Sequence, residues 1–387
     1  MGRIIYCDNS ATTKVYPEVA EEISKYFTEC FGNPSSVYSL GRVAKNYINQ
    51  ARERVAKILN CDPEEIYFTS GGSESDNIFV KGCFKENSAI ITSSIEHPAI
   101  LNACKAIHKL GALQITLPVN KSGIIDLEQV KQLEGLIKKE KPIYATVMLV
   151  NNETGMIQPI KELCSYLKSI CPNLIFHTDA VQACGKVSID VKELGVDSLS
   201  LSGHKFGAPK GIGILYLKKG IRCNPLIDGG GQENGLRSGT ENVPYIMGIT
   251  KALEITHKKY LRSLQPYGMK EFDALFLTEL LYWIEDAKLN GESSNRAYGV
   301  FNICFSGVNA QNLLLYLDNH DICVSAGSAC HSDKDTPSHV LRAMGLSEDE
   351  ALSSLRFSLK DPISSSSIKY IIKTLQDGIA QQKKYGI

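Results

Sequence analysis

The chain has 387 residues, enough for one large domain and a smaller one. Its 42 basic residues balance 42 acidic ones, which argues against a general nucleic-acid binder, because such proteins usually carry a basic excess. Hydrophobic residues make up 43% of the chain, yet no apolar run reaches the roughly 20 residues that span a bilayer. We therefore expect a globular protein with no direct nucleic-acid partner and no membrane partner.

Twelve cysteines are scattered along the chain without a CxxC pair. Neither a zinc ribbon nor a thioredoxin-type motif is indicated, and no metal site is expected. The N-terminal residues have no long apolar stretch and do not resemble a signal peptide. We therefore expect a cytoplasmic protein whose cysteines are reduced thiols, most of them small core residues.

Short β-branched runs alternate with longer helical patterns over the first 200 or so residues. Strands are predicted at residues 66–69, 88–93, 112–117, 143–150, 174–177 and 198–201, and helices at 73–85, 98–110, 127–139 and 160–170. Repeated strand–helix–strand units predict a mostly parallel sheet that is covered on both faces. Such sheets carry their ligand sites at the carboxyl ends of the strands.

The pattern changes after about residue 250. A helical run over 243–282, broken near Gln265-Pro266, leads into predicted strands at 300–305 and 322–324 and helices at 310–319 and near 338 and 365. We expect an α/β protein with a large domain over residues 16–255. A smaller α+β domain would comprise residues 1–15 and 256–387.

The run Ser202-Gly-His-Lys205 follows a predicted strand and precedes the glycine-broken segment 210–213. A lysine at a strand end, flanked by Ser and His and followed by glycines, is typical of one that holds an aldehyde cofactor as a Schiff base. Such a lysine must lose its proton at neutral pH, so it needs a pocket that lowers its pKa. The alternative is an ordinary solvated surface lysine.

Polar residues follow four other predicted strands. In Thr69 to Asn77, Gly72 and Ser73 suit a phosphate at a helix start, although a helix cap would use the same residues. Asp179 ends an apolar strand, where a lone carboxylate needs a cationic partner such as a protonated pyridine nitrogen. A salt bridge or a helix cap is the alternative for Asp179.

His97, in Glu96-His-Pro98, could stack on a ring or move protons, or could be merely structural. Asn152 could donate to a phenolate oxygen, although an Asx-turn is the plainer interpretation. The lysine run and these four strand-end segments together provide what pyridoxal phosphate requires. They supply a phosphate site, a ring-stacking group, an O3′ donor, a carboxylate for the ring nitrogen and a Schiff-base lysine.

One cysteine has a different context from most of the others. Residues 325–337 are small, polar or charged, with glycine and proline punctuation, and Cys330 lies among them. This composition predicts a loop in which a thiol can reach a ligand. His331 and Lys334 could favour its thiolate, although a bystander cysteine is the alternative.

Nearly end to end, the sequence resembles the pyridoxal-phosphate cysteine desulfurases of the NifS/IscS type, which belong to the class-V aminotransferase family. The resemblance rests on the following segments: Asp8 to Thr13, Gly32 to Ser36, Thr69 to Asn77, Glu96 to Pro98, Asn151 to Gly155, His177 to Gln182, Ser202 to Lys205, Arg237 to Asn242, Gly327 to Cys330 and Pro337 to Arg342. The set is highly specific, although its single members are not.

The resemblance implies a fold-type I homodimer whose large domain has a mostly parallel seven-stranded sheet. It implies that Lys205 carries the Schiff base and moves protons, that His97 stacks on the ring, and that Asp179 pairs with the ring nitrogen. The remaining implied cofactor contacts are Gln182, Asn152, Gly72, Ser73, Ser202 and His204, with Thr240 reaching the phosphate of the partner subunit. Arg356 would clamp the substrate carboxylate, with Asn152 and Asn33 nearby.

The implied activity is the removal of sulfur from L-cysteine, giving L-alanine and a persulfide on Cys330. The sulfur would pass to an acceptor protein, such as an iron–sulfur scaffold, or to thiolation chemistry. A selenocysteine lyase or a related lyase or transaminase on the same scaffold is the enzymatic alternative. A cofactor-binding or sulfur-carrier protein without turnover is the non-enzymatic one. The sequence departs from the family in the segment after Arg356, Phe357-Ser-Leu-Lys360, where a glycine is common, and at the charged run Asp333-Lys-Asp335.

Overall fold

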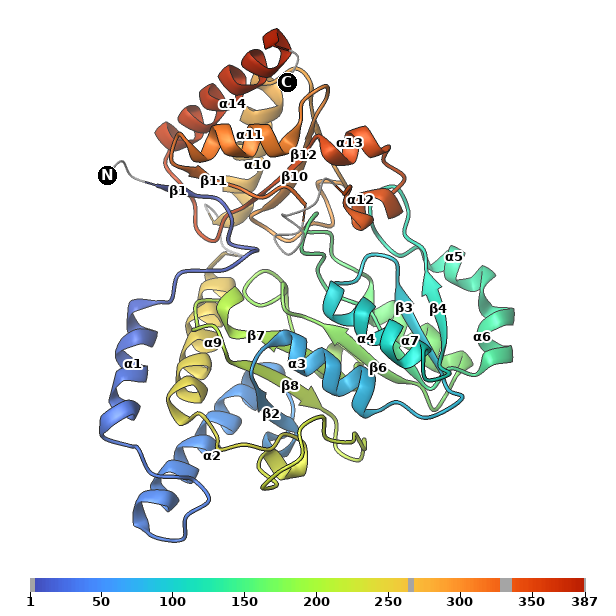
Figure 1. Ribbon diagram of the computed structural model, residues 1–387, viewed down its shortest axis with the longest axis vertical. Helices are drawn as coiled ribbons and strands as arrows, with labels where there is room; N and C mark the ends of the chain where they lie inside the picture. Colours follow the sequence, from blue (N-terminus) through green and yellow to red (C-terminus); the bar gives the residue numbers. More distant parts are fainter. Residues whose placement is uncertain (1–3, 264–267, 328–335, 386–387) are drawn as a thin grey trace.

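A computed structural model describes residues 4–263, 268–327 and 336–385 (Figure 1). Its larger sheet has seven strands in the order β2-β8-β7-β6-β5-β3-β4. They are β2 (Ile66–Thr69), β3 (Ala89–Ser93), β4 (Leu113–Leu117), β5 (Tyr144–Thr146), β6 (Ile175–Asp179), β7 (Ser198–Ser202) and β8 (Gly213–Leu217). Of these seven strands, β8 alone runs in the opposite direction to the others. The predicted α/β fold with a mostly parallel seven-stranded sheet is confirmed.

Helices cover both faces of this sheet, because successive side chains of a strand point to opposite faces. Ile91 and Ala145 belong to the largest apolar cluster, whereas their neighbours Ile90 and Tyr144 belong to a separate cluster with Phe79. The helices of this part of the chain are α1 (Pro17–Thr28), α2 (Ser39–Leu59), α3 (Gly72–Asn77), α4 (Pro98–His108), α5 (Leu127–Gln132), α6 (Glu134–Glu140), α7 (Ile160–Ile170), α8 (Val191–Leu194) and α9 (Val243–Ser263). α1 and α2 pack beside α9, at one side of the sheet (Figure 1).

Two predicted elements are shorter than expected. The helix predicted at 73–85 is α3 followed by a π-helical segment, Ile78–Gly82. The strand predicted at 143–150 is β5, which ends at Thr146. Beyond it the backbone N–H of Met148 donates to the Glu96 carboxylate instead of a neighbouring strand. The segment therefore separates from β3, while the N–H groups of Val147 and Leu149 still donate to the backbone oxygens of His177 and Asp179 in β6.

A second group of elements lies at the other end of the molecule and contains both chain ends (Figure 1). β1 (Ile5–Tyr6) pairs in parallel with β11 (Ile322–Cys323). β12 (Ser354–Ser358), β10 (Val300–Phe305) and β9 (Ala287–Leu289) form an antiparallel sheet. The helices are α10 (Met269–Trp283), α11 (Ala310–Asp318), α12 (His339–Ala343), α13 (Glu348–Leu352) and α14 (Ser365–Tyr385).

This second group has its own core, in which Phe276 packs against Phe301 and Phe357 with ring centroids 5.0 and 6.1 Å apart. Burying each such ring contributes about 1.5–3 kcal/mol. α9 continues past residue 255, so a helix crosses the expected domain boundary. The boundaries of the two domains stay a prediction.

The expectation that every cysteine is a free thiol is wrong for one pair. Cys83, after the π-helical segment, and Cys223, in the loop after β8, form a disulfide with their Cα atoms 4.4 Å apart. Sequence reasoning missed it because the two residues are 140 positions apart and only the fold brings them together.

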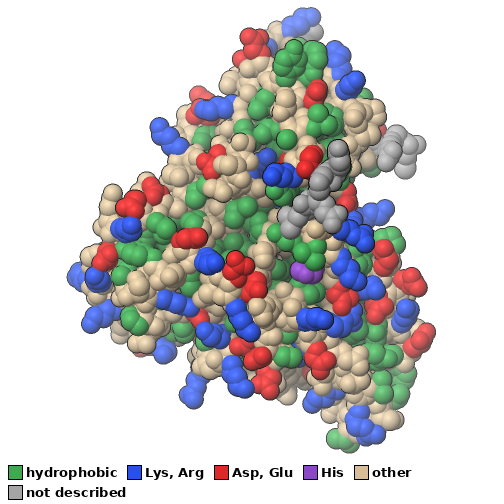
Figure 2. Space-filling view, turned by 180° about the vertical axis from the view of Figure 1, so that it is seen from behind, with side chains coloured by type: hydrophobic (Ala, Val, Ile, Leu, Met, Phe, Trp, Pro, Cys, Tyr) green, Lys and Arg blue, Asp and Glu red, His purple; other side chains and the backbone are tan. Residues whose placement is uncertain are grey.

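Basic and acidic side chains are interspersed over the face seen in Figure 2. Among the described residues no helix is long and apolar enough to cross a membrane.

Candidate active site

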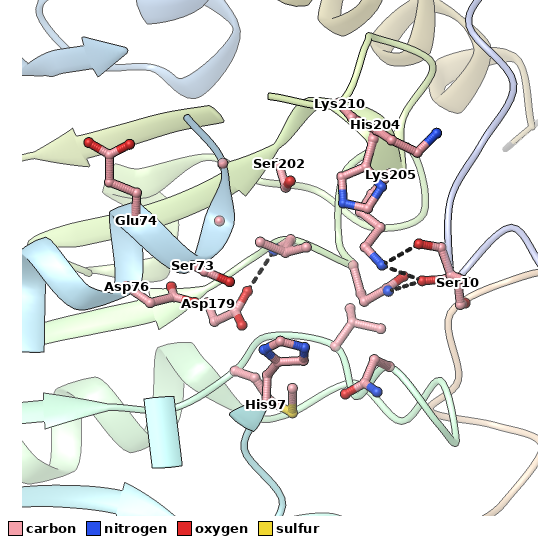
Figure 3. Close-up of a pocket in the computed structure, with 18 of the residues that line it drawn as sticks. Ser10, Ser73, Glu74, Asp76, His97, Asp179, Ser202, His204, Lys205 and Lys210 are labelled. Atoms are coloured by element: carbon pink, nitrogen blue, oxygen red, sulfur yellow. Dashed lines mark hydrogen bonds between the residues drawn. The ribbon is translucent and has the colours of Figure 1, made fainter. Parts of the chain in front are cut away.

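A cavity of about 450 Å³ lies at the carboxyl edge of the parallel strands (Figure 3). The ends of β2, β5, β6 and β7, the start of α4, the N-terminal segment and β12 all contribute to it, because parallel strands end at the same edge of a sheet. Of the predicted site residues, it is lined by Gly72, Ser73, His97, Asn152, Asp179, Gln182, Ser202, His204, Lys205 and Arg356.

Lys205 lies on a 3₁₀ turn, Gly203–Lys205, immediately after β7. Its Nζ donates to the backbone oxygens of Ser10 and Ala11, at 2.6 and 2.8 Å. Figure 3 shows the side chain crossing one side of the cavity toward the N-terminal segment. The amine is thus held inside the cavity, within reach of a group bound there, as a Schiff-base lysine must be.

Asp179 ends β6 and is buried, and its Oδ1 accepts the backbone N–H of Val181 at 2.9 Å. Burial raises the pKa of this carboxyl to about 6, and the charge of Lys205 opposes the shift. A buried carboxylate is costly without a cationic partner. A protonated pyridine nitrogen in the cavity would be such a partner.

Asp76, in α3, is a site residue that sequence reasoning did not single out. It lines the same cavity beside Asp179 (Figure 3), and its Oδ1 has no hydrogen-bond partner among the described residues. Burial, together with the charge of Asp179, holds its pKa well above the usual range. Two carboxyls in one apolar site cannot both ionise cheaply, so Asp76 retains its proton and Asp179 is the one that carries charge. Asp76 could have been found from its position, because it lies in the strand-end run Thr69 to Asn77 that the sequence had already marked as part of the site.

The start of α3 approaches the cavity closely. A side chain at Gly72 would place a Cβ 2.6 Å from Cγ2 of Val181 and 3.4 Å from the Cβ of Ser202. Only a glycine leaves room for the backbone there, and the N–H groups at this turn are available to an anion. Ser73 and Ser202 line the same space.

His204 completes this side of the cavity. Its Nδ1 lies 3.1 Å from the Thr12 hydroxyl, and burial together with the charges of Lys205 and Lys210 lowers its pKa to about 4. The imidazole is therefore neutral at neutral pH, and it can serve a phosphate as a neutral hydrogen-bond donor.

His97 is the N-cap of α4, followed by Pro98 at the first helical position. Its Nδ1 accepts the N–H of Ala99 at 3.2 Å, so the neutral ring carries its proton on Nε2. The ring faces the space between Asp179 and Lys205 (Figure 3). The preceding Glu96 is fully buried, and burial raises its pKa to about 8, so that it too is protonated at neutral pH.

Arg356, on β12, is only 1% exposed. Its guanidinium donates to the backbone oxygen of Asn152 at 3.0 Å and to Oδ1 of Asp8 at 2.7 Å. Its Nε has no partner among the described residues, although the side chain lines the cavity. An orphaned N–H of a buried guanidinium in this position fits an incoming carboxylate.

Two predicted residues do not line this cavity, and a third lies outside the described residues. Asn33 is exposed in the turn before α2, where its side chain accepts the N–H of Ser35. Thr240 lines a neighbouring pocket, which shares Ser70 and Gly211 with the first cavity. Cys330, with His331 and Lys334, lies outside the described residues. The roles of all three stay predictions.

The described residues on either side of the Cys330 segment are held at the cavity. Ser325 exchanges backbone hydrogen bonds with Arg356, and its hydroxyl donates to Asp8. On the other side, the Ser338 hydroxyl donates to Glu153, and His339 Nε2 lies 3.0 Å from the backbone oxygen of Glu96. The described residues before this segment therefore lie beside Arg356, the candidate for binding the substrate carboxylate. Those after it lie beside Glu96, the neighbour of the ring-stacking candidate His97.

These observations fit pyridoxal phosphate. Burial raises the pKa of the Asp179 carboxyl even with Lys205 nearby, the Gly72 turn has room only for backbone, and the lysine amine lies inside the same cavity. Among the described residues no group of His, Cys, Asp and Glu side chains could hold a metal ion.

Comparisons with known proteins agree with this site. Residues 5–370 match the family model described as aminotransferase class-V. The chain is 42% identical to cysteine desulfurase IscS of Clostridium botulinum (strain Hall), over 99% of this chain and 96% of that protein. It is 44% identical to cysteine desulfurase IscS of Methanosarcina thermophila, over 92% of this chain and 87% of that protein. A solved NifS-like protein superposes with a TM-score of 0.89 at 33% identity, covering 98% of this chain and all of the other.

Proposed function

This chain belongs to the aminotransferase class-V family, and from that membership we propose how its own residues carry out the reaction. The protein is a pyridoxal-phosphate-dependent cysteine desulfurase, as its full-length similarity to cysteine desulfurases indicates. The observation that carries the proposal is one cavity that brings together Lys205, Asp179, His97 and Arg356. Four separate elements place these residues, and each residue suits a different part of the cofactor or substrate.

We assign the cofactor contacts by side-chain chemistry. Lys205 Nζ would bond the cofactor aldehyde, Asp179 would pair with the ring nitrogen, and His97 would cover the ring. Gln182 and Asn152 would form hydrogen bonds with O3′ of the cofactor. The phosphate is held by the N–H groups at Gly72 and Ser73, with Ser202 and His204. Bound in this way, the cofactor withdraws electrons from the α-carbon of the substrate.

The remaining residues bind the substrate and move protons. Arg356 pairs with the substrate carboxylate, using the guanidinium face that Asp8 and Asn152 leave open. The amine of Lys205 would hold and move the α-proton of the substrate at Nζ, and His97 would present a proton on Nε2. The Cys330 thiolate bonds to the substrate sulfur while the carbon–sulfur bond breaks. Alanine leaves with a proton at its β-carbon, and a persulfide stays on Cys330.

We also propose that the protein acts as a homodimer. Exposed apolar side chains gather at the end of α1 and the start of α2, where Val37 is 88% exposed: Phe27, Phe31, Val37, Tyr38, Leu40 and Val43. Monomers rarely leave such a group uncovered. In a dimer, Thr240 would serve the cofactor phosphate of the partner subunit, and Asn33 would reach a substrate only in the assembly.

The sulfur acceptor belongs to the same proposal. The relatives are named IscS, which supports an iron–sulfur scaffold protein as the acceptor, in the cytoplasm. When the enzyme is loaded with isotopically labelled sulfur from cysteine and then incubated with such a scaffold, the labelled sulfur should move to the scaffold. Retention of all label on the enzyme would contradict this acceptor.

The central experiment is to incubate the purified holoenzyme with L-cysteine, measure alanine, and search by mass spectrometry for one added sulfur on Cys330. Lys205→Ala should lose both signals, together with the visible absorbance of the lysine-bound cofactor. Cys330→Ala should keep that absorbance but lose sulfur transfer. Alanine formation from selenocysteine with none from cysteine would contradict the proposed substrate, and a persulfide on another cysteine would contradict the proposed nucleophile.

A further inference from the structure

A second cavity, of about 290 Å³, shares only Lys205 with the first among their described lining residues. It lies between the N-terminal segment, the turn after β6, the end of α9 and the segment that follows β12. Its volume is close to the about 300 Å³ at which pockets begin to hold small molecules. The reaction in the first cavity does not require it.

The lining of this second cavity is strongly basic. Among its described residues, one acidic side chain, Asp361, faces five basic ones: Lys186, Lys205, Lys259, Arg262 and Lys360. The basic residues come from elements far apart in the sequence, so the fold gathers them. Cations that converge on an enclosed space repel one another unless an anion lies between them.

The one carboxylate does not neutralise the group. Asp361 pairs with Lys259 at 3.1 Å, at the more exposed side of the cavity. The Nζ of Lys360 lies 3.6 Å from the centre of the Tyr16 ring and has no ion pair among the described residues. Lys259 lies over the same ring at 5.0 Å, so Tyr16 lies against two ammonium groups. A cation–π contact contributes less than the anionic partner that a buried ammonium needs.

Lys186 is placed in a similar way. Its Nζ donates to Oε1 of Gln182 at 2.9 Å, which uses one of the three ammonium protons. Burial and the charges of Lys205 and Arg356 lower its pKa to about 7. Burial likewise lowers the pKa of Lys360 to about 8. The charged form of both lysines is therefore disfavoured by the cavity lining alone. An anion between the two amines would favour the charged form again.

The position of Lys360 is closely constrained. A side chain at Gly207 would place a Cβ 2.4 Å from the Tyr16 ring and 2.9 Å from the Nζ of Lys360. Lys360 also follows β12, the strand that carries Arg356, by two residues. A ligand held by Lys360 and Lys186 would thus join the end of β12 to the turn after β6.

We propose that the second cavity binds a small oxyanion carrying two or more negative charges, held between Lys186 and Lys360 with Lys259 at its exposed side. Phosphate and polycarboxylates share this chemistry. Their oxygens can accept charge-assisted hydrogen bonds from several ammonium groups at once.

The test uses the holoenzyme, in which the cofactor already occupies the phosphate site of the first cavity. Inorganic phosphate and citrate are titrated separately by calorimetry, with sodium chloride at matched ionic strength as the reference. Saturable one-site binding of either anion, with a rise in melting temperature that chloride does not reproduce, is the expected result. Binding of phosphate alone or of citrate alone identifies which chemistry the cavity prefers.

The variants locate the site. Lys360→Met should weaken binding about tenfold or more, because it removes one charge-assisted contact, whereas Lys360→Arg should keep most of the affinity. Lys258→Met is the matched control, because Lys258 is exposed on the same helix as Lys259 but does not line the cavity. The proposal is overturned if the wild type shows no saturable binding, if Lys360→Met binds as tightly as the wild type, or if the anion displaces the cofactor absorbance.

Discussion

Arg356 and Asp8 form an ion pair of 2.7 Å across 348 positions of sequence. The other oxygen of Asp8 accepts a hydrogen bond from the hydroxyl of Ser325, three residues before the first undescribed position in this region. One carboxylate thus orients the substrate-clamp candidate and anchors the approach to the Cys330 segment. The N-terminal segment is therefore part of the candidate active site, although it lies far from the other lining residues in sequence.

Replacing Asp8 should affect substrate binding more than chemistry. Asp8→Asn removes a charge-assisted hydrogen bond of about 1.5 kcal/mol from Arg356, so KM for cysteine should rise about tenfold with a smaller change in kcat. Steady-state alanine production measures both constants. Asp377→Asn, in an exposed pair with Lys373, is the control. An unchanged KM would show that Asp8 does not position the guanidinium.

The two buried carboxyls should respond differently to the same isosteric change. Asp179→Asn removes the charge proposed to pair with the ring nitrogen and should weaken cofactor retention by about 150-fold or more, because breaking a buried pair costs about 3–5 kcal/mol. Asp76→Asn should have little effect, because burial and Asp179 already keep that carboxyl protonated. Dialysis followed by absorbance measures retention. Equal losses in the two variants would contradict this division of charge.

Glu96 should make stability depend on pH. Burial raises its pKa from 4.5 to about 8, so the folded protein holds a proton that the unfolded chain releases between these values. Its contribution to the free energy of unfolding therefore falls as pH rises from about 4.5 to about 8. Glu96→Gln cannot ionise, so urea unfolding of this variant should show a shallower decline than the wild type. Asp76 and Asp179 also lower the free energy of unfolding as pH rises, but they do so equally in the wild type and in the variant. If the two proteins lose stability with pH at the same rate, the role of Glu96 is refuted.

Gly72 should tolerate no side chain. In Gly72→Ala, the new Cβ meets Val181 at 2.6 Å, and relieving that contact by moving the start of α3 costs roughly 1–3 kcal/mol. Cofactor affinity should fall about tenfold, as measured by equilibrium titration of the apoenzyme. Gly135→Ala, on α6 with open space around it, should leave the affinity unchanged. A Gly72→Ala enzyme with normal affinity would place the phosphate elsewhere.

Local patterns in the sequence predicted the alternation of strands and helices and the carboxyl-edge location of Lys205, Asp179 and His97, which line one cavity. The reason is that side-chain periodicity and strand-end motifs are properties of short segments. The strand predicted at 143–150 is an exception: its pairing with β3 ends early, because the N–H of Met148 donates to the Glu96 carboxylate and not to β3.

Tertiary structure alone decided which groups become neighbours and how deeply they are buried. It joined Cys83 to Cys223, paired Asp8 with Arg356, and put Asp76 beside Asp179 in one cavity. The protonation state of a carboxyl and the charge balance of a cavity depend on desolvation and on distances across the fold. No run of residues encodes these quantities, which is why the basic second cavity appears only in three dimensions.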